Sequence, residues 1–328
     1  MPLDTNLVLA TPLETLHLEL GARMVPFAGY CLPVQFRDGI LKEHLHTRRQ
    51  AGLFDISHMG QIRLQGPAAA AALETLVPAE LQNLDPGRIR YTVLTDAQGG
   101  ILDDLMVTNA GDHLFLVVNA ACKHADLAHL RHHLGQRLGV ELLERRALLA
   151  LQGPAAAVVL ARLVPAVATM PFMSSLDATL DGLPVLISRC GYTGEDGYEL
   201  SVAADHAEAV ARRLLAEPEV APIGLGARDS LRLEAGLCLY GHDIDRSTTP
   251  VEAGLGWSIG RRRRLEGGFP GDAVILEQFA HGPGRRRVGL RLEGRQPARE
   301  HTPILDAAGN QIGVSTSGGF GPTVNGPI

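Results

Sequence analysis

The sequence Leu-Gln-Gly-Pro-Ala-Ala-Ala occurs twice in this chain, at residues 64–70 and again at residues 151–157. Both copies run into an alanine- and leucine-rich stretch typical of a helix, which ends in Leu-Val-Pro. A strand, a turn, a second strand and a helix are then predicted in each copy. The offset of roughly 85 residues is far longer than the period of a solenoid. The predicted fold class is therefore α+β, with a duplicated β-α-β-β-α-β unit near 64–134 and 151–215.

Two such units side by side would form a pseudo-symmetric body, and the crevice between them is a natural ligand site. The two predicted hairpins carry unlike residues. The first presents Asp103 and, at the end of its second strand, Asn119. The second contains a glycine-rich turn at residues 191–197, followed early in the return strand by Glu199. We expect the two acidic residues inside that turn to be solvated, and Glu199 to be the acid that faces a pocket.

Residues 99–107, Gly-Gly-Ile-Leu-Asp-Asp-Leu-Met-Val, place two acids in an otherwise apolar strand that leaves a glycine turn. Buried carboxyl groups cost free energy unless they are paired or hydrogen-bonded. Successive strand residues point to opposite faces, so Asp103 and Asp104 cannot both face one pocket, and one of them is a candidate for chemistry. The alternative interpretation is local, because an aspartate after a turn commonly caps backbone amides or ends a strand.

Composition limits the class of protein. With 328 residues, 45% hydrophobic and 20% charged, the chain is long enough for two or three globular domains. A net charge of −6 argues against a nucleic-acid partner and an anionic membrane surface, and no stretch has the apolar length of a spanning helix. Four cysteines without Cys-x-x-Cys spacing predict neither a zinc ribbon nor a disulfide framework. Because the first residues also lack the basic character of a leader, we expect a cytoplasmic protein.

Three helices are predicted outside the repeats, one of them a polar helix over residues 41–51. An amphipathic helix is expected over residues 11–24, because Thr-Pro-Leu-Glu supplies a capping residue and a proline at the first helical position. The third helix is expected over residues 224–240, where Arg228 and Arg232 lie four residues apart and share a face. These arginines are candidates for a ligand site, or else form surface ion pairs of little energetic value.

The last part of the chain has a different character. The basic run at residues 261–264 is interpreted as a solvated face, or as a docking surface for an acidic partner. From about residue 285, short alternating segments divided by Gly, Pro and Asn predict an all-β module. Only about three strands are visible there, which is too few to close a barrel.

Six segments follow one another in order along nearly the whole chain: Phe-Asp-Ile-Ser-His-Met-Gly at 54–60, the Asp-Asp stretch at 99–107, Arg-Cys-Gly-Tyr-Thr-Gly-Glu-Asp-Gly-Tyr-Glu-Leu at 189–200, the tract 226–240, Thr-Pro-Val-Glu at 249–252, and Trp257. In this combination the chain resembles the aminomethyltransferase, or T protein, family of the glycine cleavage system. The resemblance implies two interleaved α+β lobes around a central folate pocket, within residues 1–270. It also implies a C-terminal β-barrel lobe over residues 280–328, which is expected to be incomplete because family members continue beyond Ile328.

The resemblance further implies a one-carbon transfer with tetrahydrofolate as co-substrate and no metal. The aminomethyl group would come from the reduced lipoyl arm of a partner H protein, giving 5,10-methylenetetrahydrofolate and ammonia. By this resemblance the catalytic carboxylate is Asp103, and Asp104 is structural. The folate-contacting residues implied are Glu199, which would bind the donor edge of the pterin, and Arg228, Asn119, Tyr192 and Trp257.

Two alternatives stay open at this stage. One is a related tetrahydrofolate-dependent demethylase acting on another one-carbon donor, such as a methylated glycine. The other is a folate-binding accessory protein without turnover. Dependence on a lipoylated carrier would separate the first alternative from the main interpretation, and turnover itself would exclude the second.

Overall fold

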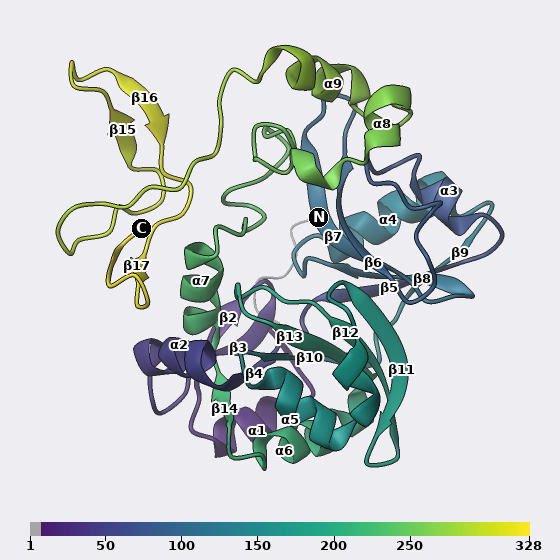
Figure 1. Cartoon of the computed structure of the whole chain (residues 1–328), viewed down its shortest axis with the longest axis vertical. Coiled ribbons are helices and arrows are strands. Elements are labelled where there is room, and N and C mark those ends of the chain that lie inside the picture. Colours follow the sequence, from purple (N-terminus) through teal and green to yellow (C-terminus); the bar gives the residue numbers. More distant parts are fainter. Residues whose placement is uncertain (1–7) are drawn as a thin grey trace.

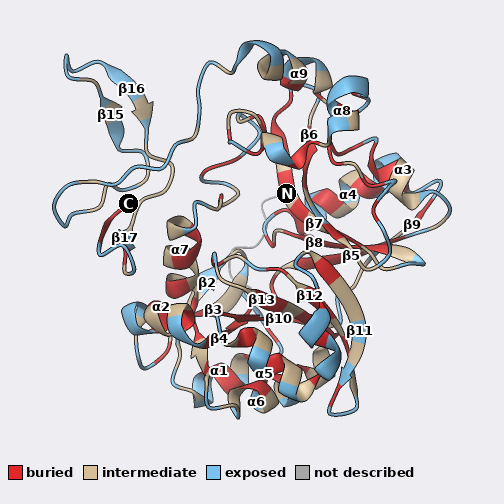
Figure 2. Ribbon diagram, viewed as in Figure 1, coloured by how far each residue is buried: buried red, intermediate tan, exposed pale blue. Residues whose placement is uncertain are grey.

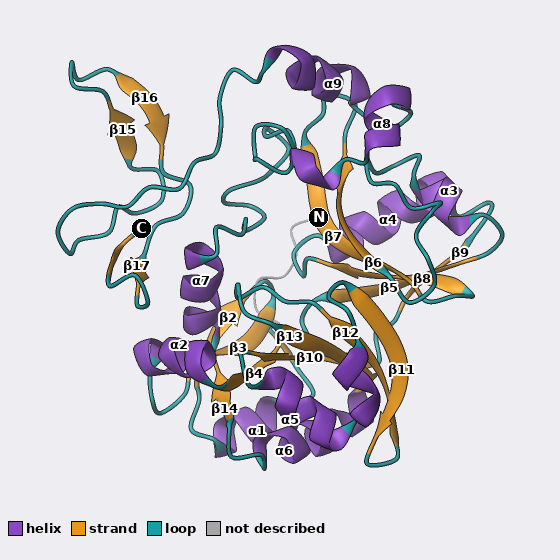
Figure 3. Ribbon diagram, in the orientation of Figure 1, coloured by secondary structure: helices purple, strands orange, loops and turns teal. Residues whose placement is uncertain are grey.

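A computed structural model describes residues 8–328 as two α+β lobes and a smaller C-terminal part (Figure 1). The first lobe is a five-stranded sheet with the strand order β6-β7-β8-β5-β9. Two helices cover one face of this sheet (Figure 3). Its elements are β5 (Gly60–Gln65), α3 (Ala69–Leu73), β6 (Ile89–Thr95), β7 (Ile101–Asn109), β8 (His113–Val118), α4 (Lys123–Leu134) and β9 (Gly139–Leu142).

The second lobe repeats this arrangement, which confirms the predicted duplication. Its six-stranded sheet has the order β11-β12-β13-β10-β4-β14. The elements that match the first lobe are β10 (Arg146–Gln152), α5 (Ala156–Leu163), β11 (Ser174–Leu180), β12 (Leu183–Arg189), β13 (Gly197–Ala203), α6 (Ala207–Leu215) and β14 (Val220–Ile223). The additional strand β4 (Ala51–Asp55) precedes the first lobe in sequence and lies between β10 and β14. The lobes are therefore interleaved, as expected.

The glycine of the repeated motif explains why both copies keep it. Gly66 and Gly153 have φ angles of 145° and 129°, a region that residues with a Cβ atom avoid. A Cβ atom on Gly153 would also lie 2.2 Å from the carbonyl oxygen of Gln50. In both lobes this glycine lets the chain turn sharply from a central strand into the first helix.

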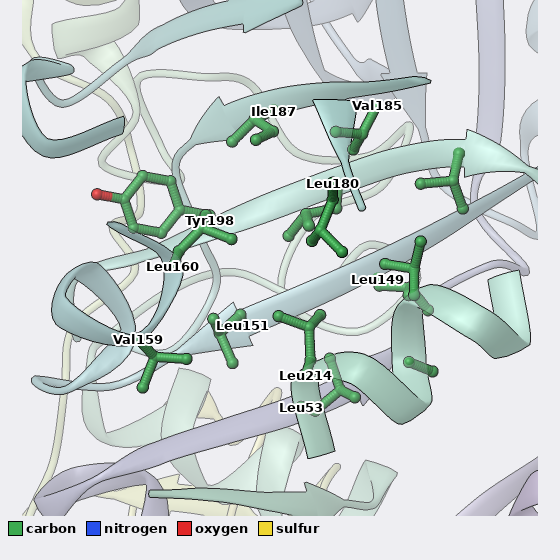
Figure 4. Close-up of a cluster of buried hydrophobic side chains, with 14 of the residues drawn as sticks. Leu53, Leu149, Leu151, Val159, Leu160, Leu180, Val185, Ile187, Tyr198 and Leu214 are labelled. Carbon is green, nitrogen blue, oxygen red and sulfur yellow. The ribbon is translucent and has the colours of Figure 1, made fainter. Parts of the chain in front are cut away.

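Buried side chains concentrate on the sheets of the two lobes (Figure 2). The largest cluster lies in the second lobe, where β10 and β13 pack against α5 and α6 (Figure 4). A separate cluster joins the lobes, because Phe115 and Val117 of β8 pack against Phe54, Leu148 and Leu231 of the second lobe and α7 (Leu225–Glu234). The face of the first sheet that is free of α3 and α4 is thus held against the second lobe.

The remaining elements surround these lobes. The N-terminal part contains β1 (Leu9–Ala10), α1 (Glu14–Glu19), β2 (Arg23–Phe27), β3 (Tyr30–Gln35) and α2 (Ile40–Arg49). The chain beyond α7 contains α8 (Arg261–Glu266), α9 (Asp272–His281), and two short antiparallel pairs formed by β15 (Pro303–Leu305), β16 (Gln311–Val314), β17 (Phe320–Gly321) and β18 (Gly326–Pro327). No helix among residues 8–328 is long and apolar enough to cross a bilayer.

The helix predicted over residues 41–51 is confirmed as α2, whereas those predicted over 11–24 and 224–240 are shorter than expected, and glycine is the reason in both cases. α1 ends before Gly21, whose φ of 77° lies outside the right-handed helical region, and the chain then enters β2. α7 ends before Gly236, whose φ is 70° and whose neighbour Leu237 bonds back to Arg232 at 2.9 Å. This is the usual glycine-terminated helix end.

The basic run predicted to be solvated or free for docking is instead bonded within the molecule. Arg262 pairs with Glu74 at 2.6 Å and with Glu80 at 3.3 Å. Arg263 is buried and donates to the carbonyl oxygen of Glu74, while Arg264 donates to two carbonyl oxygens of the preceding loop. Arg262 and Arg263 fasten α8 to the first lobe, so both sequence interpretations of the run were wrong for these two arginines, whereas Arg264 is exposed.

The turn that leads into β7 is crossed closely by another segment. Gly99 has a φ of 83°, and the N–H group of Ile101 donates to carbonyl oxygens of Asp245 and Thr248 at 3.1 Å. A Cβ atom on Gly100 would lie 1.9 Å from the carbonyl oxygen of Arg246, a contact that only a backbone shift could relieve.

We therefore expect Gly100→Ala to lower the free energy of unfolding by about 1–3 kcal/mol, as overpacked interiors do. Urea denaturation measures this loss. Gly284→Ala is the matched control, because a Cβ atom there meets no atom within 4 Å. Equal stability of the two variants would contradict the close approach of the loop to this turn.

Candidate active site

The two acids of β7 lie on opposite faces of the first sheet. Asp103 pairs with Leu94 and Asp104 with Val93 across the ladder to β6. The Asp103 face is the one covered by α4, and the Asp103 side chain is fully buried. Asp104 lies on the face that turns toward the second lobe, together with Met106 and Val117.

This geometry corrects the expected roles of the two acids. The family resemblance assigned the pocket to Asp103 and a structural role to Asp104. Strand alternation requires opposite faces but does not say which face is covered, and here α4 covers the face of Asp103. Asp104 is therefore the acid that lies on the face toward the second lobe.

Asn119 connects both acids. Its side-chain Nδ2 donates to Asp103 Oδ1 at 2.9 Å and to Asp104 Oδ1 at 2.7 Å, and its main-chain N–H donates to Asp103 Oδ2 at 3.0 Å. The amide group that sequence reasoning assigned to ligand contact is therefore engaged by the two aspartates. Asn119 positions the acids rather than offering free N–H donors.

Aromatic side chains extend the site from Asp104. Tyr91 lies on the same face of β6 and donates its hydroxyl to Asp104 Oδ2 at 3.0 Å. Its ring stacks on Trp257, with ring centroids 5.3 Å apart and an interplanar angle of 24°. Trp257 is 66% exposed, which is unusual for the only tryptophan of a chain. Sequence reasoning missed Tyr91. Strand alternation was a usable signal, because Tyr91 lies two residues before Val93, the partner of Asp104, and therefore on the same face of the sheet.

The second lobe contributes an acid, a guanidinium group and a ring. Arg228 of α7 lies over the ring of Tyr192, with Cζ 4.7 Å from the centroid. The Tyr192 hydroxyl donates to the carbonyl oxygen of Cys238, which holds the ring in place. Burial raises the pKa of Glu199, and the charge of nearby Arg228 opposes this rise. Arg228 Nη1 is buried without a hydrogen-bond partner among the described residues, so this donor is unused.

Gln152 holds the loop that carries Tyr192. Its buried side chain donates to the carbonyl oxygen of Cys190 at 2.9 Å and accepts from the Thr193 hydroxyl at 3.0 Å. Gly191 leaves room for it, because a Cβ atom there would lie 1.8 Å from Gln152 Oε1. The glutamine of the repeated motif thus has a specific task in the second lobe, whereas Gln65 at the same place in the first lobe is exposed.

Glu195 and Asp196, the two acidic residues of the glycine-rich turn, were expected to be solvated but are paired with arginines. Asp196 forms two hydrogen bonds with Arg189, at 3.0 and 2.6 Å. Glu195 pairs with Arg48 of α2 at 2.9 Å. Both pairs fasten the glycine-rich turn to its surroundings, and Glu199 is the acid of this segment that has no arginine bonded to it.

Asp104 is electrostatically the most unusual group of the site. Burial and the adjacent charge of Asp103 raise its pKa to about 7. Burial raises the pKa of Tyr192 in the second lobe, and the charge of Asp104 adds to this rise. The site offers a carboxylate that titrates near neutrality, a second carboxylate beside a free guanidinium N–H, and exposed or half-buried rings. Such a set suits a flat polar ligand that has both hydrogen-bond donors and acceptors.

Comparison with known proteins identifies the class. The GCVT N-terminal domain matches residues 13–263, and the glycine cleavage T-protein C-terminal barrel domain matches residues 285–328. The chain is 50% identical to a mitochondrial aminomethyltransferase of Gallus gallus, over 96% of this chain and 82% of that protein. A mitochondrial aminomethyltransferase of Dictyostelium discoideum is 46% identical, over 97% of this chain and 83% of that protein.

A solved structure agrees with these matches. The glycine cleavage system aminomethyltransferase T of Bartonella henselae superposes with a TM-score of 0.92 at 45% identity, covering 98% of this chain and 88% of that one. The chain belongs to the glycine cleavage T-protein family. Its activity is that of an aminomethyltransferase, and the predicted α+β fold with a C-terminal barrel-type lobe is confirmed.

One expectation is contradicted by the same relatives. The composition suggested a cytoplasmic protein, but the relatives from Gallus gallus, Dictyostelium discoideum and Solanum tuberosum are named as mitochondrial enzymes. The cytoplasmic expectation rested on the cysteine spacing and on the character of the first residues, and the names of these relatives contradict it.

Proposed function

We propose that the chain transfers the aminomethyl group of a partner H protein's dihydrolipoyl arm to tetrahydrofolate, releasing ammonia and leaving 5,10-methylenetetrahydrofolate. The observation that carries this proposal is the set of Asp104, Glu199 and Arg228 around the aromatic side chains between the lobes. In this proposal the catalytic region is residues 1–270, and the barrel lobe covers residues 280–328.

Glu199 and Arg228 fit the recognition of a pterin. The 2-amino group and N3–H of a pterin are two parallel donors, which one carboxylate can accept together. The unpartnered Nη1 of Arg228 can donate to an acceptor on the same ligand. Tyr192, Tyr91 and Trp257 supply ring faces and edges against which a flat heterocycle can pack.

Asp104 fits the chemical step. Transfer replaces the carbon–sulfur and carbon–nitrogen bonds of the aminomethyl group by bonds to two folate nitrogens. One of the two protons lost from these nitrogens ends on the lipoyl sulfur, and the other leaves with ammonia. Asp104 can accept such a proton, and its negative charge stabilises the cationic carbon–nitrogen unit that develops. A carboxylate with a pKa of about 7 is well matched to proton transfer at neutral pH.

The test is formation of methylenetetrahydrofolate from tetrahydrofolate and an aminomethyl-loaded, lipoylated H protein. We expect product in proportion to the loaded carrier. Because oxidation of a methyl group to the methylene level removes two electrons, the parallel reactions with free N-methylglycine or N,N-dimethylglycine include an electron acceptor, and we expect no product from them. Product from a methylated glycine without carrier would favour the demethylase alternative. Folate binding without product from any donor would contradict the proposed transfer.

A further inference from the structure

Behind Asp104, on the covered face of β7, lies a pair of buried carboxyl groups. Asp103 is 0% exposed and Asp126, in the first turn of α4, is 3% exposed. Each of these carboxyl groups shifts the pKa of the other. Two interacting carboxyl groups do not both ionise when they are buried and one of them, Asp126, has a buried oxygen without a hydrogen-bond partner among the described residues. The pair therefore shares one proton. The mechanism above makes no use of this proton.

Hydrogen bonding decides which acid carries the charge. Asp103 accepts two N–H donors from Asn119, one on each carboxylate oxygen, and such donors stabilise the ionised form. Asp126 Oδ2 is buried and has no donor among the described residues. The anion therefore belongs on Asp103 and the proton on Asp126. The pKa of Asp126, which burial and the Asp103 charge raise to about 10, agrees with this placement.

Asn119 joins this pair to Asp104. The Nδ2 atom of Asn119 donates to both aspartates, to Oδ1 of Asp103 at 2.9 Å and to Oδ1 of Asp104 at 2.7 Å. A fixed negative charge on Asp103 lies next to Asp104 and disfavours its ionisation. No lysine or arginine forms a salt bridge with any of the three acids among the residues the structure describes.

We propose that Asp126 is a positioning residue that keeps one proton buried, so that Asp103 remains the anion behind Asp104 and Asp104 accepts a proton at neutral pH. The role given to Asp104 in this inference rests on the proposed function. The location of the buried proton does not, because it depends only on the folded chain.

Other titratable groups face the three acids from several elements. Asp104 faces Tyr91 of β6, Tyr192 of the loop before β13, and Cys238 after α7. The Asp103–Asp126 pair faces Cys122 at the start of α4 and Tyr240. Burial and the nearby acids raise the pKa of each of these thiol and phenol groups, so they stay neutral across the range tested below.

The experiment compares Asp103→Asn, Asp126→Asn and the wild-type enzyme by the pH dependence of kcat/KM in the carrier assay. Removing the charge of Asp103 should lower the pKa of Asp104. We therefore expect the acidic limb of the kcat/KM profile, the range in which activity rises with pH, to shift to lower pH by about one unit or more. The amide introduced at position 126 can still donate to Asp103, so Asp126→Asn should keep the wild-type limb. A shifted limb in Asp126→Asn, or an unshifted limb in Asp103→Asn, would overturn the inference.

A second measurement does not need turnover. In the wild-type chain with ¹³C-labelled aspartate, one carboxyl resonance should stay protonated up to pH 8 and disappear in Asp126→Asn. Asp38→Asn, at an exposed position beside Lys42, is the matched control and should leave that resonance in place. If every aspartate is ionised at pH 8, the shared proton does not exist. An inactive wild type with this resonance present would contradict the proposed function and leave the proton placement standing.

Discussion

Asp104→Asn is expected to fold, to bind folate and to lose about 10²–10⁴-fold in kcat, the usual contribution of a positioned general base. The amide has the shape of the acid and can still accept the hydroxyl donor of Tyr91, which lies at 3.0 Å. It cannot accept a proton and carries no charge to stabilise a developing cation. The loss should therefore appear in kcat, with little change in the Kd for tetrahydrofolate.

The pH dependence gives an independent check on the same residue. The ionised form of Asp104 is the one that acts, and it predominates above its pKa of about 7. Activity of the wild type should therefore rise as the pH increases through about 7, and the residual activity of Asp104→Asn should lack this limb. If Asp104→Asn retained full kcat while Asp103→Asn lost it, the assignment made from the family resemblance would be restored.

Glu199→Gln is expected to weaken folate binding most. The substitution replaces one acceptor oxygen by an NH₂ group that faces the ligand's own donors, and it removes the charge beside Arg228. Truncation of one partner in a buried charged pair costs about 2–5 kcal/mol, which corresponds to roughly 30-fold to several-thousand-fold weaker binding. Calorimetric titration with tetrahydrofolate measures the change in Kd directly.

The control for this variant is Glu208→Gln, which changes an exposed carboxylate on α6 that pairs with Arg212 at 2.8 Å. Exposed pairs of this kind contribute little, so the Kd of the control should match that of the wild type. A Kd within twofold of the wild type for Glu199→Gln would remove Glu199 from the binding site.

The duplicated fold was predictable because its signal is internal to the chain. The Leu-Gln-Gly-Pro motif recurs with the same succession of elements, and its glycine is required by a φ angle in both copies. Element ends were less predictable. The first residues of β2 were assigned to a helix, because their pairing with β3 depends on a neighbouring strand that the local pattern does not reveal.

The sequence named most residues of the proposed site, but not the direction in which the two aspartates face. Alternation along β7 correctly placed Asp103 and Asp104 on opposite faces. Which face is covered depends on where α4 packs, and that helix follows some twenty residues later. In the same way, the involvement of Asn119 with both acids depends on the register between β7 and β8. Tyr91 and Asp126 gained their roles only once three segments of the chain were brought together.

Strand β4 has a consequence for how the nascent chain matures. Its five residues are all buried, yet its partners are β10 and β14, and β14 is synthesised about 170 residues later. At 5–20 residues per second, a ribosome needs roughly 10–30 seconds to supply that partner. The first lobe, residues 60–142, can close during this interval. β4 has neither partner until β10 is made about 95 residues after it, and it keeps one unpaired edge, which is prone to aggregation, until β14 follows. We expect nascent chains in which residues 60–142 have left the ribosome to contain a folded first lobe, with residues 51–55 open to chaperones until β10 follows.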